Sequence, residues 1–114
     1  MSLITREPTH AERRLRQRRS HELLGEFLAL GEEKDLPVLD WRVTEFALVG
    51  GARGVDRTQR RVAFESWTAA LDLGRWEDRE SPTGHVHLHA YTENWQGRRV
   101  SVAVMAGIAP EDPA

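Results

Sequence analysis

The segment from residue 84 to residue 108 carries the pattern that most restricts the fold of this chain. Between Val86 and Thr92 every second residue is apolar or β-branched, and the residues between them are histidines and a tyrosine. Successive side chains of a β-strand point to opposite faces, so this alternation predicts a strand with one apolar face. A second run of β-branched and small apolar residues follows at 100–108, so we expect the two segments to form a hairpin.

The two strands of this hairpin divide their side chains between two faces. A three-residue loop at 95–97 would set the register. The expected pairs are then Thr92 with Val100, Ala90 with Val102 and Leu88 with Val104. The other face carries the residues that we expect to form an interface: His85, His87, His89, Tyr91, Ser101, Ala103 and Met105. This face is too apolar for ordinary surface and too polar for a second core, which favours contact with a protein partner.

A first helix is expected near the N-terminus. Thr9 and Glu12 have the spacing of a capping box, which predicts a helix from Thr9 to Gly31. Its clear apolar face lies only in the second half, at 23–30. Ser20 could therefore cap a shorter helix instead, and the sequence leaves both starting points open.

A strand region and a second helix follow. Residues 38–49 are rich in β-branched and aromatic residues, which predicts one strand or a bent pair, with a bulge near Glu45. Asp56 and Gln59 mark a helix start, and apolar residues continue the helix as far as Gly74.

The order of elements predicts an α+β domain. We expect two helices packed on one face of a mainly antiparallel sheet of about four strands, in the order α-β-α-β-β-β, with residues 76–81 as an edge strand. The predicted division is a basic arm or helix start at 1–19, a single α+β domain at 20–108 and a flexible tail at 109–114.

Composition excludes several classes of function. The 114 residues suit one domain, and the absence of cysteine excludes disulfides, thiolate metal sites and cysteine nucleophiles. No apolar run is long enough to span a membrane, so we expect a cytoplasmic protein without a membrane partner. The sequence has no Ser-His-Asp order and no carboxylate pairing beyond chance, so neither enzymatic activity nor a cofactor is expected.

Arginines are concentrated near the N-terminus. Five of them lie within seven residues that contain no acid: Arg13, Arg14, Arg16, Arg18 and Arg19. The net charge of −2 excludes a broad polyanion-binding surface, so any contact with nucleic-acid phosphates would be local to this segment. Such runs are also typical of solvated helix faces and of arms that dock on a partner.

A glycine-rich loop precedes the second helix. Its candidate anion-binding residues are Gly50, Gly51, Arg53, Gly54 and Arg57. Free backbone N–H groups and the dipole at a helix start attract anions, which makes the loop a candidate site for phosphate or a nucleotide. The alternative is a solvated first turn, supported by an ion pair between Arg61 and Glu65.

The histidines of the 84–108 segment are also candidate metal ligands. His85, His87 and His89 would lie on one side of a strand, about 6.5 to 7 Å apart at each step. A complete site would need ligands from another strand or subunit. Strand alternation explains their shared side without a metal, so none is assigned.

Two resemblances bear on these readings. The segment 50–57 resembles the Gly-Gly-Ala-Arg-Gly-x-Asp segment of SLOG-type nucleotide-sensing domains, which implies a glycine loop near a nucleotide-derived ligand. It covers under a tenth of the chain, and the sequence lacks the earlier strand-Gly-Arg-Asp segment and the several parallel strands of those domains.

A longer resemblance runs through 41–49, 61–71, 87–90 and 100–104. These segments are similar to small uncharacterised actinobacterial proteins, many of them from developmental or mobile-element contexts. Those proteins have no catalytic residues to transfer, so the resemblance implies fold and source alone.

These observations predict a non-catalytic regulatory or adaptor protein that acts through protein–protein contacts as a homodimer. Its partner would be a second copy or another protein. Two other functions stay open: accessory nucleic-acid binding through the arginine segment, and binding of a small ligand through the 50–57 loop.

Overall fold

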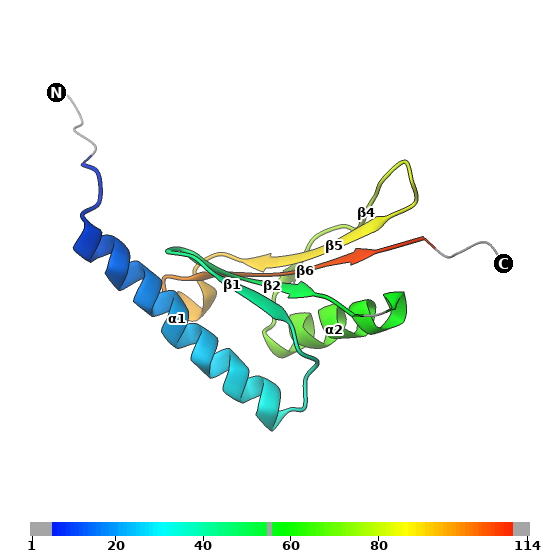
Figure 1. Ribbon diagram of the computed structural model, residues 1–114, viewed down its shortest axis with the longest axis horizontal. Coiled ribbons are helices and arrows are strands. Elements are labelled where there is room, and N and C mark those ends of the chain that lie inside the picture. Colours follow the sequence, from blue (N-terminus) through cyan, green and yellow to red (C-terminus); the bar gives the residue numbers. More distant parts are fainter. Residues whose placement is uncertain (1–5, 55, 111–114) are drawn as a thin grey trace.

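The computed structural model describes residues 6–54 and 56–110 and shows two helices on one side of a single open sheet (Figure 1). The elements in chain order are α1 (His10–Glu33), β1 (Asp40–Val43), β2 (Ala47–Ala52), α2 (Arg57–Ala70), β3 (Gly74–Arg75), β4 (Arg79–Glu80), β5 (Val86–Thr92), a short 3-10 turn at Trp95–Gly97, and β6 (Ser101–Ile108). No helix among these residues has the length and apolar character to cross a membrane.

Helix α1 begins where its capping box predicts. The Thr9 side chain accepts a hydrogen bond from the Glu12 backbone, and the Glu12 side chain accepts one from the Thr9 backbone. The helix is continuous, and Ser20 is fully buried in its middle, so the shorter helix capped by Ser20 is wrong. The helix also passes Gly31 and ends at Glu33; a Cβ on Gly31 would lie 3.2 Å from the Trp67 ring, so this glycine allows α1 to approach α2 closely.

Helix α2 also has the predicted start. The Asp56 carboxylate accepts a hydrogen bond from the Gln59 backbone N–H at 2.8 Å. The helix ends at Ala70 with Leu71 as its C-cap, earlier than the predicted Gly74. Asp72 takes a left-handed φ of 52°, which turns the chain so that Gly74 can begin β3.

The sheet is mixed and has six strands in the order β1-β2-β6-β5-β3, with β4 also paired to β5. The α+β class is confirmed, but the sheet has six strands instead of about four, and one of its strand pairs is parallel. A turn at Thr44, whose hydroxyl bonds with the backbone of Ala47, divides the 38–49 region into β1 and β2. Strand β2 then pairs in parallel with β6, a long-range contact that no local pattern specifies. Of the expected edge strand at 76–81, only β4 is a strand, and β3 lies just before that range; both pair with β5.

The β5–β6 hairpin exists, but its predicted register is wrong by two residues. Thr92 pairs with Val102 and Ala90 with Val104. The cause is Trp95, whose ring packs on Phe27 and whose Nε1 donates to the Leu71 carbonyl, so the connection is longer than three residues. A shift of two preserves the face of every side chain, so the division into two faces is as expected.

The core lies between the sheet and both helices. Fully buried aliphatic side chains from β5 and β6 form its floor: Leu88, Ala90, Val102 and Val104. Above them the rings of Phe27, Trp41, Trp67 and Trp95 pack with centroids 5.0 to 5.6 Å apart. The helices therefore cover one face of the sheet and leave the other uncovered (Figure 1).

The predicted terminal segments lie partly outside the described residues. Of the basic arm at 1–19, residues 10–19 form the first turns of α1, and residues 1–5 are not described. Of the tail predicted at 109–114, residues 111–114 are not described.

Candidate functional site: the open face of the sheet

The uncovered sheet face collects most of the residues predicted for an interface. We call it the open face, and its described members on the three central strands are Ala47, Val49, Gly51, His87, His89, Tyr91, Ser101, Ala103, Met105 and Gly107. His85 is the exception: it precedes β5, and its ring bonds to the Thr83 hydroxyl in the β4–β5 turn. The strand alternation therefore placed these side chains correctly, apart from the first histidine.

Aromatic side chains line one side of the open face. The Trp76 ring lies 4.5 Å from the His89 ring and 6.1 Å from the Tyr91 ring, centroid to centroid. The His87 ring lies 6.0 Å from that of His89. We call these four residues the aromatic ridge. A backbone hydrogen bond from Trp76 N–H to the His89 carbonyl, 2.9 Å long, fixes the tryptophan beside β5.

Sequence reasoning missed Trp76 as a member of this site. The sequence predicts an edge strand at 76–81 and gives Trp76 no face, and in the structure Trp76 lies outside both short strands, β3 and β4. A signal was present: a large aromatic side chain in the charged run 75–80, outside any amphipathic pattern, is a candidate for a surface contact. Its side chain is 48% exposed.

Small side chains occupy the middle of the open face. Strands β2 and β6 place Ala47 opposite Ser101, Val49 opposite Ala103, and Gly51 opposite Met105. We call Ala47, Val49, Gly51, Ser101 and Ala103 the small-residue strip. These side chains are shorter than the rings on β5, so the open face has a high side and a low side.

The surroundings of His89 on the ridge shift its pKa. Burial, then the neighbouring His87 and Arg79, lowers the pKa of His89 below its usual 6.5. Arg79 of β4 pairs in register with His87, which places its positive charge at the end of the ridge. His89 is therefore held in its neutral form, as suits a contact that excludes water.

The three histidines do not assemble a metal site. His87 and His89 are adjacent, whereas the His85 ring is engaged by Thr83. Within residues 6–54 and 56–110, no group of three histidine or carboxylate side chains is arranged to hold a metal ion.

The glycines of the predicted anion loop have packing roles. A Cβ on Gly50 would lie 2.8 Å from Leu39 Cδ1 and 2.9 Å from the Trp41 ring, so the helix-covered face requires a glycine there. Gly51 belongs to the opposite, open face. A Cβ on Gly54 would lie 3.1 Å from Gln59 Cβ, so this glycine allows the loop to approach α2.

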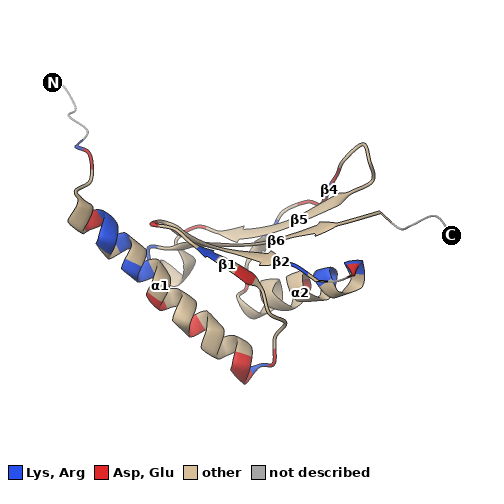
Figure 2. Cartoon of the chain, viewed as in Figure 1, with Lys and Arg blue, Asp and Glu red and all other residues tan. Residues whose placement is uncertain are grey.

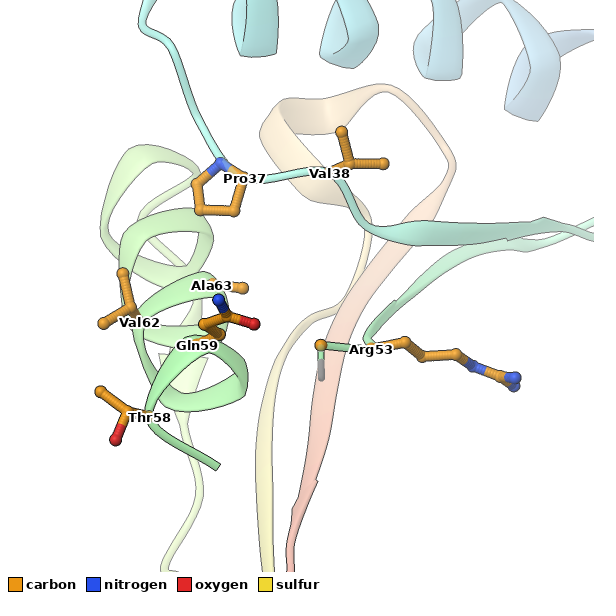
Figure 3. Close-up of a pocket in the computed structure, with 8 residues that line it drawn as sticks. Pro37, Val38, Arg53, Thr58, Gln59, Val62 and Ala63 are labelled. Atoms are coloured by element: carbon orange, nitrogen blue, oxygen red, sulfur yellow. The ribbon is translucent and has the colours of Figure 1, made fainter. Parts of the chain in front are cut away.

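The two arginines of this loop are positioned by different elements. The Arg53 side chain points away from α2 (Figure 3) and pairs with Asp40 at 3.1 Å. Arg57 is the first residue of α2, and the loop also includes Val55, which lies outside the described residues. The expected pair of Arg61 with Glu65 is not formed, because Glu65 pairs with Arg75 instead. Anion binding through this loop stays a prediction.

The N-terminal arginines point around α1 and form no single stripe. Arg13 pairs with Glu45 at 2.5 Å, and the Arg16 guanidinium lies 4.8 Å from the centre of the Phe46 ring, so both are engaged by the β1–β2 turn. Arg14 and Arg18 flank Val43 on one side of the helix, and Arg19 lies near Arg99 on the other. Figure 2 shows these positive charges in the N-terminal half of α1 and negative charges in its C-terminal half. Nucleic-acid contact through this segment stays a prediction, with Arg14, Arg18 and Arg19 as the side chains that form no ion pair among the described residues.

No protein-family model matches the sequence, and the comparisons with curated proteins and with solved structures also find no match. The open face is therefore assigned as a candidate site from the geometry of this structure alone.

Proposed function

We propose that this chain is a non-catalytic regulatory or adaptor protein that works as a homodimer, with the open face as the subunit interface. The observation that carries this proposal is that one face holds both an aromatic ridge and a small-residue strip beside it. A high and a low region on the same surface are what a two-fold interface needs, because each patch then meets the other patch of the partner.

The arrangement gives a simple docking geometry. Two sheets packed face to face lie about 10 Å apart, with their inner side chains interleaved. A two-fold axis across the open face would set the aromatic ridge of each subunit against the small-residue strip of the other. The large rings then fill the space that the short side chains leave.

The chemistry of the open face supports a protein partner. Its centre holds aromatic, methionine, alanine and histidine side chains, and its charged residues, Asp40, Arg42 and Arg79, lie on the outer strands. Depletion of charge at the centre, together with enrichment in aromatic residues and methionine, is typical of protein interfaces.

Sedimentation velocity tests this function. We expect the protein to be a dimer at about 50 μM, and Met105→Asp and Trp76→Ala to be folded monomers with the wild-type helix and strand content by circular dichroism. Leu15→Asp is the matched control, since Leu15 is 50% exposed on α1, away from the open face. A monomeric wild type at this concentration, or dimers in both open-face variants, would remove the proposal.

A further inference from the structure

Exposed aliphatic side chains gather at a second place, on the helix side of the molecule. Six large apolar side chains are exposed among the described residues, and three of them line two neighbouring hollows that share Pro37 and Val38: Leu28 (53%) in one, Val62 (52%) in the other, and Val38 (90%) between them. Leu28 belongs to α1, Val38 to the 34–39 linker and Val62 to α2. We call the surface around them the linker groove.

The linker groove is preformed by the fold. Leu36 N–H donates to the Gly31 carbonyl at 2.9 Å, and Trp67 Nε1 donates to the Pro37 carbonyl at 2.5 Å. Leu39 is buried in the core, so the backbone on both sides of Val38 is held in place. Figure 3 shows Pro37 and Val38 across the hollow from Val62 and Ala63. Exposed aliphatic groups on a fixed backbone lose little entropy when a partner covers them.

The two ends of the linker groove carry opposite charge. Glu32 and Asp35 line it beside Leu28 and Trp67. Beyond Val62, the surface continues over Arg57 and Arg61 of α2, beside Glu65, whose carboxylate pairs with Arg75. Among the described residues, Glu32, Asp35 and Arg61 form no ion pair with another side chain. A bound chain would therefore be oriented by its charges.

We propose that the linker groove binds a short segment of another protein. This segment has two apolar side chains that contact the groove on either side of Val38, a positive residue near Glu32 and Asp35, and a negative residue near Arg57 and Arg61. The described part of this chain offers no such segment for a second copy. Its other exposed large apolar residues are Leu15, Phe46 and Trp76, which are scattered over α1, the β1–β2 turn and the open face.

A displayed library of random peptides about 12 residues long provides the probe. Peptides are selected for binding to the wild-type protein, and those that also bind Val38→Asp are removed. Val38 is 90% exposed, so this substitution leaves the core unchanged. We expect the selected peptides to share two apolar positions between a basic and an acidic residue. Their affinity, measured by fluorescence polarisation, should fall about tenfold or more in Leu28→Asp.

Matched variants separate this groove from general stickiness and from the open face. Leu15→Asp has the same substitution on the same helix at similar exposure, and it should bind the peptides like wild type. Arg61→Glu should weaken binding, and a peptide with its acidic residue changed to lysine should recover it. Met105→Asp should bind the peptides like wild type. Peptide binding therefore tests the groove even if the protein is not a homodimer.

Three outcomes would overturn the inference. The first is that no selected peptide needs Val38 for binding. The second is that Arg61→Glu leaves peptide binding unchanged. The third is a change in sedimentation of the protein alone on Val38→Asp, which would mean that a second copy occupies the groove.

Discussion

The two faces of the sheet are formed by the same strands but differ in how far their side chains are buried. On the helix-covered face, Leu88, Val102 and Val104 are fully buried and in contact with the helices. On the open face, the adjacent residues His89 and Tyr91 are only partly buried, against Trp76. The covered face is packed as a core, whereas the rings of the open face contact one another at the surface. Substitutions on the two faces should therefore act on different measurable quantities.

The largest difference is expected from two truncations of similar size. Leu88→Ala removes a fully buried side chain and should lower the free energy of unfolding by about 2 to 5 kcal/mol. Met105→Ala, on the open face, should cost the monomer less than about 1 kcal/mol and weaken self-association. Urea denaturation at low protein concentration gives the first quantity, and sedimentation gives the second. Equal losses of stability would mean that the open face is part of the monomer core.

Two adjacent glycines sharpen the comparison. Gly50→Ala puts a methyl group 2.8 Å from Leu39 Cδ1 and 2.9 Å from the Trp41 ring, so overpacking should cost about 1 to 3 kcal/mol. Gly51→Ala points to the other face, where the nearest atom is the Asp40 carbonyl oxygen at 3.8 Å. Its stability should change by no more than about 0.5 kcal/mol. Thermal or urea unfolding of both variants checks this, and a destabilised Gly51→Ala would contradict the assignment of faces.

The sequence predicted the faces better than it predicted the partners of the strands. Alternation along Val86–Thr92 is a local signal, and a register error of two residues leaves it intact. The pairing of β2 with β6 and the insertion of Trp95 against Phe27 depend on residues far apart in the chain. A period-two pattern cannot specify such contacts, so the mixed sheet and the longer connection were missed.

The residues of the candidate sites show the same difference between what a local pattern predicts and what only the fold brings together. The histidine and tyrosine positions followed from strand alternation, whereas Trp76 joins them through a hydrogen bond to β5 from a segment without a pattern. The five N-terminal arginines are close in sequence, but each helical residue is rotated about 100° from the last, so they separate in space. The linker groove brings α1, the linker and α2 together, and no single segment indicated it.

The smallest expected effect concerns protonation on the open face. The folded state lowers the pKa of His89, mainly through burial and then through His87 and Arg79. The unfolded chain therefore binds more protons between the two pKa values, and stability rises with pH across that interval. The contribution is fully present above the ordinary histidine value of about 6.5 and decreases as the pH falls through and below it.

Urea unfolding at pH 7.5 and pH 5.5 tests this linkage, because these values lie about one unit above and about one unit below the ordinary histidine pKa. The wild type should be less stable at the lower pH, and His89→Gln should lose part of that difference. His21→Gln, an exposed histidine on α1, is the control and should keep the wild-type dependence. In a dimer, protonation would also place charge at the centre of the interface, so acid should favour monomers in sedimentation. If His89→Gln keeps the full pH dependence of both quantities, His89 is an ordinary surface histidine and the open face is not sensitive to acid through it.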